Sequence, residues 1–160
     1  MAKEKLSITQ AVRVLKEKGA DFTLRTYTYE EKGGTPVASR ELGVDEHQVV
    51  KTLVMEDDRK NPLLILMHGD NQVSTKNLAR ALGAKSVEPC DPETAHRHTG
   101  YVVGGISPFG TRKPLKVYVE ASVLELPKIY INAGKRGLLA EMPPQELKRV
   151  LNPISVNVAI

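Results

Sequence analysis

The order of short elements along the chain restricts its fold more than any other feature. Through residue 100, strand-like runs alternate with short helices, whereas residues 101–142 hold four strand-like runs with no helical pattern between them. A doubly wound parallel sheet needs a helical crossover between successive strands, and this chain has too few. The pattern therefore predicts an α+β fold built on a mixed, largely antiparallel β-sheet.

Capping residues indicate where the helices begin and end. Ser7 with Gln10 indicates a capping box for the first helix, which Gly19 ends. Proline at the first helical position opens one helix after Thr35 and another after Asp91. The other expected helices are 74–83 and 145–151, and the expected strands are 22–29, 50–55, 63–67, a short run near 87, 101–103, 115–120, 128–132, 138–142 and an edge strand at 154–160, with 50–55 and 63–67 paired as a hairpin.

Composition is that of a globular protein, and we expect one domain over residues 1–160. Hydrophobic residues make up 41% and charged residues 26%, without a biased tract. No apolar run approaches the ~20 residues that span a bilayer. A secretory signal requires an apolar segment after the N-terminal charges, and the sequence has none there. A lone cysteine, Cys90, rules out an intrachain disulfide and suits a reducing cytosol. We therefore expect a cytoplasmic protein with no membrane partner.

Two glycine-built bends are the first candidates for a binding site. They are the strings GGISPFG at residues 104–110 and AGKRG at 133–137. Glycine lets a ligand approach the main chain closely, and successive N–H groups at such bends bind anions. The net charge of +4 comes wholly from residues 101–160, which carry 8 Lys/Arg against 4 Asp/Glu, while the first 100 residues carry 15 of each. This asymmetry favours an anionic partner near the bends, although +4 is also an ordinary solubility charge.

Nucleotide triphosphate hydrolysis does not fit the first bend. Gly105 and Gly110 have the spacing of a P-loop, but Thr111 stands where the lysine is required, and Pro114 would break the helix that must follow. Aromatic residues make up only 4% of the chain and tryptophan is absent, so an extended base-stacking platform is not expected either. Contact with the end of a nucleic acid remains compatible with the composition.

Zinc and cysteine chemistry are also disfavoured by the pattern. His96 and His98, with Cys90 nearby, could suggest a zinc site, yet residues two apart on a helix do not share a face. Cations near a helix C-terminus are the favoured interpretation of the histidines. Cys90 has no basic neighbour in the following turn, and a small core residue is a better interpretation than a nucleophile. We expect no metal and no cofactor.

Lys51 and Tyr27 are the remaining polar candidates, and the pattern leaves both open. Lys51 lies in the otherwise apolar string VVKTLV, where it either faces solvent on an alternating strand or projects into a cavity beside the first bend. Tyr27 is either a half-buried strand tyrosine or a pocket wall. A site of lysine, threonine, tyrosine and backbone N–H groups could bind an ester and polarise its carbonyl. It supplies no protein nucleophile, so water or the substrate would attack.

Three strings carry a specific similarity. They are VKTLV at residues 50–54, TGYVVGGISPFG at 99–110 and IYINAGKRG at 129–137. Together they closely resemble the YbaK/EbsC family, which includes Cys-tRNA(Pro) deacylases and the editing domain inserted in bacterial prolyl-tRNA synthetases. The resemblance spans about residues 7–151. It implies a barrel-like mixed sheet surrounded by short helices, and an enzyme that hydrolyses mischarged aminoacyl-tRNA in translation.

The resemblance also implies roles for individual residues. Lys51 matches the family's essential lysine, expected to engage the terminal nucleotide or the ester, and Thr52 follows it as in the family. Gly104 matches the glycine whose backbone contacts the scissile aminoacyl group, and Tyr27 matches a pocket tyrosine. Further substrate-binding candidates are Gly105, Ile106, Ser107 and Asn132, and the candidate tRNA phosphate contacts are Lys135 and Arg136.

The expected reaction is trans-editing hydrolysis of Cys-tRNA(Pro) at the 3′ end of the tRNA, with prolyl-tRNA synthetase as a candidate partner. In the Cys-specific branch the resemblance implies that the substrate's own thiol attacks its carbonyl and releases a thiolactone, a lyase-like outcome; water attack is the alternative. The short Gly33-Gly34 loop and Asn132, where a serine often stands, depart from the family pattern and could border the pocket. An Ala-tRNA(Pro) deacylase and a non-catalytic tRNA- or synthetase-binding module therefore remain alternatives.

Overall fold

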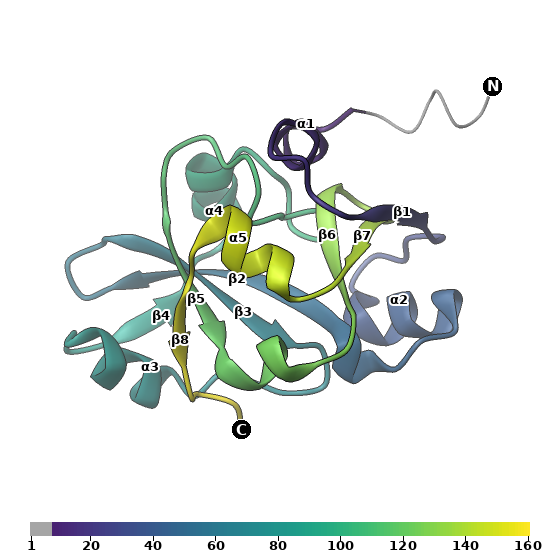
Figure 1. Cartoon of the computed structure of the whole chain (residues 1–160). Coiled ribbons are helices and arrows are strands. Elements are labelled where there is room, and N and C mark those ends of the chain that lie inside the picture. The colour runs from purple at the N-terminus through teal and green to yellow at the C-terminus, as the bar shows by residue number, and fades with distance from the viewer. Residues whose placement is uncertain (1–7) are drawn as a thin grey trace.

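The computed structural model describes residues 8–160, which form a mixed β-sheet with helices on both faces (Figure 1). Eight strands of this range pair in the order β1-β7-β6-β2-β3-β5-β8, with β4 paired to β2 beside that path. The strands are β1 (Thr23–Thr26), β2 (Val49–Asp57), β3 (Pro62–His68), β4 (Val87–Pro89), β5 (Lys116–Glu120), β6 (Ile129–Lys135), β7 (Leu138–Met142) and β8 (Ile154–Val156). The helices are α1 (Gln10–Glu17), α2 (Gly34–Leu42), α3 (Thr75–Leu82), α4 (Pro92–Thr99) and α5 (Gln145–Leu151), with 3-10 turns η2 (Glu46–Gln48) and η3 (Ala121–Glu125).

The pairing directions confirm the α+β class and the mixed sheet. Strand β2 pairs antiparallel with β3 and β4 but parallel with β6. The β1–β7 and β6–β7 pairs are antiparallel, whereas β5 runs parallel to both β3 and β8. Within the described range β1 and β8 are opposite edges that do not pair with each other, so the barrel-like sheet stays open.

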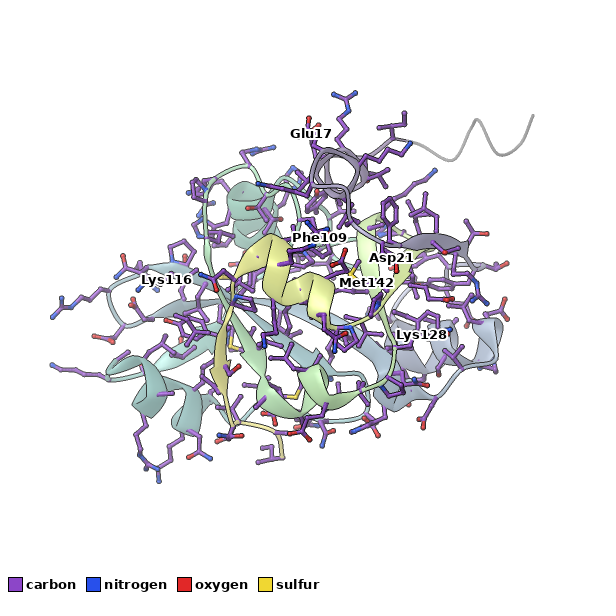
Figure 2. All side chains as sticks on the ribbon, in the orientation of Figure 1. Glu17, Asp21, Phe109, Lys116, Lys128 and Met142 are labelled. Carbon is purple, nitrogen blue, oxygen red and sulfur yellow. The ribbon has the colours of Figure 1, made fainter. Side chains whose placement is uncertain are left out.

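Alternation along the strands sends side chains to two separate cores. Val50 and Leu66 belong to the core covered by α1 and α5, and Val54 packs with Ala95 of α4 on the same face. The other face carries Met67, packed against α3, and Val49, packed against α2. Figure 2 shows how the side chains fill these layers; Phe109 is completely buried and Met142 is 1% exposed.

The helix boundaries read from capping residues are largely confirmed. Asp45, Ser74 and Asp91 are N-caps whose side chains accept backbone N–H groups of η2, α3 and α4. Gly83 and Gly100 end α3 and α4 in the left-handed conformation, with φ of 75° and 82°. The hairpin of β2 and β3 is also confirmed.

Three sequence expectations need correction. The proposed cap Ser7 lies outside the described residues, and α1 begins at Gln10 with Thr9 as its N-cap. The second helix begins at Gly34, before Thr35, because the Thr35 hydroxyl lies 2.8 Å from Glu46 Oε2 and 3.1 Å from the Gly69 carbonyl instead of capping the helix. Residues 101–103 form no strand: the Tyr101 hydroxyl donates to the Phe109 carbonyl over 2.6 Å, which folds the segment into a loop.

None of the helices described in residues 8–160 is long and apolar enough to cross a membrane.

Candidate active site

Lys51 lies near the start of β2 and is half-buried, on the face of the sheet that α2 covers. Its Nζ donates to the Gly69 carbonyl across 3.4 Å. Burial lowers the pKa of Lys51 below its ordinary value of 10.5, and the negative charges of Glu46 and Asp70 oppose that shift. Lys51 is therefore not a freely solvated surface lysine, which was one of the two interpretations left open by the sequence.

Tyr27 follows β1 and packs on the same side of the sheet. It joins the apolar cluster of Val49 and Tyr130, and alternation places Val49 and Lys51 on one face. Its backbone N–H donates to the Gly137 carbonyl over 3.0 Å, which ties the segment to the turn between β6 and β7. Burial, and then the neighbouring Tyr29, raise the pKa of the Tyr27 hydroxyl. The structure thus places Tyr27 beside the second glycine bend.

The loop after α4 needs glycine at two successive positions. Gly104 has a φ of +93°, a conformation that other residues rarely adopt, and a Cβ there would lie 2.7 Å from the Tyr29 hydroxyl. A Cβ on Gly105 would lie 2.8 Å from the backbone nitrogen of Arg136. The two glycine bends, separate in the sequence, therefore pack directly against each other.

Asn132 links the two bends through its side-chain amide. Its Nδ2 donates to the carbonyls of Gly104 and Lys135 over 3.1 and 3.2 Å. Its Oδ1 accepts from the N–H groups of Gly134 and Lys135 over 2.6 and 3.2 Å. The backbone register shifts between Asn132 and Lys135, so the amide fills the gap that this β-bulge opens. Asn132 fixes the position of Gly104.

Strand register brings Asn132 to the side of Lys51. The parallel pairing of β2 with β6 aligns Val49 with Tyr130 and Val50 with Ile131. Lys51 follows Val50 on β2, and Asn132 follows Ile131 on β6. Because side chains alternate along a strand, Lys51 and Asn132 lie on the same face as Val49 and Tyr130. The Gly104 carbonyl, which accepts a hydrogen bond from Asn132, therefore lies on the side of the sheet from which Lys51 projects.

Arg136 completes the contact between the bends. Its Nε donates to the Val103 carbonyl over 3.0 Å, and its guanidinium lies 5.0 Å from the centre of the Tyr29 ring. Both Lys135 and Arg136 are exposed at the surface. Sequence reasoning did not single out Tyr29, because a tyrosine at the end of a strand-like run carries no signal of this packing.

The structure separates other candidates from Lys51. Thr52 projects to the opposite face of the sheet, and its buried Oγ1 has no hydrogen-bond partner among the described residues. Ile106 packs against the cores on that opposite face. Ser107 is completely buried, and its Oγ accepts the Phe109 N–H over 3.2 Å, which shapes the loop. Ile106 and Ser107 anchor the loop that follows Gly104 on that side of the sheet.

The surroundings of Lys51 include polar residues that the sequence did not indicate. The Gly69 carbonyl is shared by Lys51 and by the hydroxyl of Thr35. Asp70, the next residue, is 2.7 Å from His47 Nδ1. These groups come from the turns at the ends of β2, β3 and α2, and no local pattern predicts that such turns meet.

The mixed sheet and the paired glycine bends belong to a known class of editing domain. A family profile described as "Aminoacyl-tRNA editing domain" matches residues 30–150. The chain therefore belongs to the aminoacyl-tRNA editing domain family. This match confirms the family resemblance of the three sequence strings. It also confirms that the chain is related to the aminoacyl-tRNA deacylases.

Particular relatives extend the comparison. EbsC of Enterococcus faecalis, whose name provisionally describes a Cys-tRNA(Pro)/Cys-tRNA(Cys) deacylase, is 28% identical over 154 residues, or 95% of this chain and 94% of EbsC. A proline–tRNA ligase of Streptococcus equi subsp. zooepidemicus is 31% identical over 96 residues, or 60% of this chain and 15% of the ligase.

Solved structures share the fold. A crystal structure provisionally described as a trans-editing enzyme for prolyl tRNA synthetase superimposes with a TM-score of 0.83 and 22% identity, covering 96% of this chain and 99% of that one. At this level of identity the match concerns the fold alone.

Proposed function

We propose that this protein is a trans-editing enzyme that removes a wrong amino acid, above all cysteine, from the 3′ end of tRNA(Pro). The observation that carries the proposal is the β2–β6 register that sets Lys51 next to Asn132, whose amide holds the Gly104 carbonyl. Similarity to EbsC over nearly the whole length of both chains supports the choice of cysteine. The match to a part of a proline–tRNA ligase supports the choice of tRNA.

The groups at this site suit the binding of an ester. Lys51 offers an ammonium, which would hold the terminal nucleotide or the ester oxygen, while the backbone of the Gly104 loop would position the aminoacyl group. Fixed donors aimed at a carbonyl oxygen stabilise the charge that develops there during attack. Tyr27 would form a wall of the pocket, and Lys135 and Arg136 would contact tRNA phosphate.

The chain's own thiol is unsuited to attack the ester. Burial, and then the negative charges of Glu56 and Asp91, raise the pKa of Cys90 to about 11, so its thiolate fraction is very small at neutral pH. In the proposed reaction the substrate cysteine's sulfur bonds to its own carbonyl carbon, the ester C–O bond breaks, and the thiol proton passes to the released tRNA 3′ oxygen. The products are a thiolactone and tRNA.

The test is a deacylation panel with tRNA(Pro) charged with Cys, Ser, Ala or Pro. We expect rapid loss of Cys, little loss of Ser or Pro, and at least ~100-fold slower loss of Cys with Lys51→Ala. Lys76→Ala, an exposed lysine on α3, is the matched control and should retain activity. Faster loss of Ala than of Cys would contradict attack by the substrate thiol and indicate attack by water. If the protein accelerates the hydrolysis of none of these esters, the proposal is refuted.

A further inference from the structure

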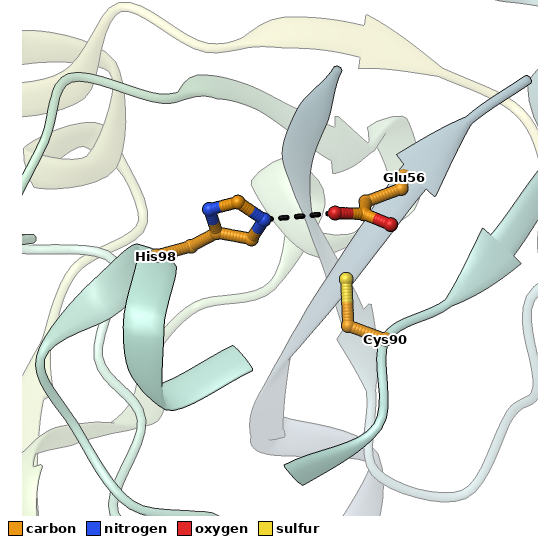
Figure 3. Close-up of side chains that lie close together, drawn as sticks. All are labelled: Glu56, Cys90 and His98. Atoms are coloured by element: carbon orange, nitrogen blue, oxygen red, sulfur yellow. Dashed lines mark hydrogen bonds and ion pairs between the residues drawn. The ribbon is translucent and has the colours of Figure 1, made fainter. Parts of the chain in front are cut away.

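A second cluster of reactive side chains lies on the opposite face of the sheet from Lys51. Glu56 of β2, Cys90 just after β4 and His98 of α4 converge, and Figure 3 shows the three side chains facing one another. One ligand atom from each lies within 4.8 Å of the other two. At ~3.3 Å per residue, Glu56 is about 16 Å along β2 from Lys51. The cluster is therefore separate from the proposed editing site.

His98 is 7% exposed and presents one ring nitrogen to the cluster. Its Nε2 lies 2.9 Å from Glu56 Oε2, but its Nδ1 is buried and has no partner among the described residues. His68 offers the comparison: it is 1% exposed, and its two nitrogens contact the His47 carbonyl and the Ser122 hydroxyl. His68 thus has both ring nitrogens engaged by the protein, whereas His98 turns Nδ1 away from Glu56 and Cys90, so Nε2 is the nitrogen that a ligand at the cluster would meet (Figure 3).

The surroundings of the cluster are strongly acidic. Glu56 and Cys90 line a cavity of about 510 Å³, which opens a path from solvent to the cluster. The same cavity is lined by the carboxylates of Asp57, Asp58, Glu88 and Asp91, against the single cation of Lys60. Such an excess of negative charge attracts a cation and disfavours an anionic ligand.

The ligand set and its spacing suit a metal ion of intermediate softness. Binding of the ion would release the Cys90 thiol proton to solvent, and the resulting thiolate, with an imidazole and a carboxylate, favours Zn²⁺ over Mg²⁺ or Ca²⁺, which prefer oxygen ligands. Tetrahedral Zn²⁺ with bonds of about 2.0–2.3 Å places its ligand atoms roughly 3.3–3.8 Å apart. The present separations, 2.9 Å between His98 and Glu56 and at most 4.8 Å elsewhere, reach that geometry through shifts of about 1 Å.

We propose that Glu56, Cys90 and His98 bind one Zn²⁺-class cation, with its fourth position open to the acidic cavity. The ion would tie α4 to β2 and to the end of β4. Because α4 leads directly into the loop of Gly104, the ion would also stiffen the base of that loop. It takes no part in the proposed deacylation, so the two proposals stand independently.

The sequence pattern did not indicate this cluster. His96 and His98 were set aside as a zinc pair because they do not share a helix face, and His96 is indeed exposed, with its Nδ1 3.1 Å from the Tyr101 carbonyl. The third ligand, Glu56, comes from a strand more than 30 residues earlier in the chain. Only the β2–β4 pairing, which sets Glu56 opposite Glu88, brings that strand to Cys90.

The experiment titrates the purified, metal-stripped protein with Zn²⁺ and with Co²⁺ as its spectroscopic substitute. We expect one ion per chain, visible Co²⁺ absorption of a four-coordinate site with a thiolate charge-transfer band, and a rise in Tm of about 5–10 °C at Zn²⁺ about 100-fold above its Kd. Cys90→Ser should abolish the charge-transfer band, and Glu56→Gln or His98→Gln should weaken affinity by more than ~100-fold.

Two variants serve as matched controls. His96→Gln alters a histidine of the same helix and should bind like the unchanged protein. Glu88→Gln removes one of several carboxylates of the same cavity and should weaken binding far less than Glu56→Gln. Absence of saturable binding to the unchanged protein would overturn the proposal. So would equal Zn²⁺ affinity and an unchanged Co²⁺ spectrum in Cys90→Ser, a variant that removes one ligand while conserving size.

Discussion

Replacing Gly104 by alanine tests whether the two glycine bends form one rigid unit. Two costs add at this position. The left-handed backbone at φ +93° costs about 1–2 kcal/mol for a residue with a Cβ. That Cβ would also overlap the Tyr29 side chain, at 2.7 Å from the hydroxyl oxygen and 2.9 Å from Cε1. Overpacking of this kind costs about 1–3 kcal/mol. We expect Gly104→Ala to lower the free energy of unfolding by about 2–4 kcal/mol.

Gly83→Ala separates the two costs. Gly83 has a φ of +75°, but a Cβ there would meet nothing within 4 Å, so this variant carries the backbone cost alone. In a Tyr29→Ala background the steric cost of Gly104→Ala should also disappear. The stability effects of Gly104→Ala and Tyr29→Ala should therefore be non-additive by about 1 kcal/mol or more.

Urea unfolding gives the stabilities, and Cys-tRNA(Pro) deacylation gives kcat/KM. Because the shifted loop carries the carbonyl that Asn132 holds, kcat/KM should fall by about 10²-fold in Gly104→Ala, while Gly83→Ala keeps its activity. The reasoning is refuted if Gly104→Ala is no less stable than Gly83→Ala, or if Tyr29→Ala leaves its cost unchanged.

Three further predictions follow from the same region. Asn132→Asp keeps the acceptor for Gly134 but loses both donated hydrogen bonds, so the urea midpoint should fall by an amount worth about 1–3 kcal/mol, and activity should fall with it. The pKa of Lys51 is lower in the folded protein, so the unfolded chain binds more protons than the folded one just below pH 10.5. The free energy of unfolding should therefore rise with pH in the unchanged protein relative to Lys51→Met, which urea unfolding across pH 7–10 would measure. Lys135→Gln should reduce the slope of log affinity against log salt for tRNA by about 1, and an unchanged slope would contradict a phosphate contact.

Local signals in the sequence account for most of the element boundaries. Ser74 and Asp91 cap helices through their own side chains, and Gly83 and Gly100 adopt the left-handed conformation that ends them. Each of these effects acts within one helical turn, so the residues on either side suffice to predict it. The β2–β3 hairpin is predictable for the same reason, since only the four residues 58–61 separate its strands.

Long-range contacts explain what the sequence did not predict. Residues 101–103 have the apolar character of a strand, yet Tyr101 is fixed by the Phe109 carbonyl and not by a neighbouring strand. The hydrogen bonds of the Asn132 amide with backbone groups of the two bends depend on the bulge in β6 and on the distant Gly104 loop. The meeting of Glu56 with His98 depends on packing between α4 and β2. No periodicity or spacing carries such information.

The strand order also dictates when during folding the site can form. Lys51 lies on a hairpin whose strands are neighbours in the chain, and local pairs of this kind form early. Its flanking strand β6 and the Gly104 loop are synthesised more than 50 residues later. Strand β1 can pair only after β7 has been synthesised, because Thr23 lies opposite Glu141. A nascent chain that has emerged only as far as α4 therefore leaves the β6-facing edge of β2 unpaired beside Lys51. The proposed arrangement of Lys51 with the Gly104 loop requires residue 132, so we expect a nascent chain that ends before this residue to lack the proposed deacylase activity.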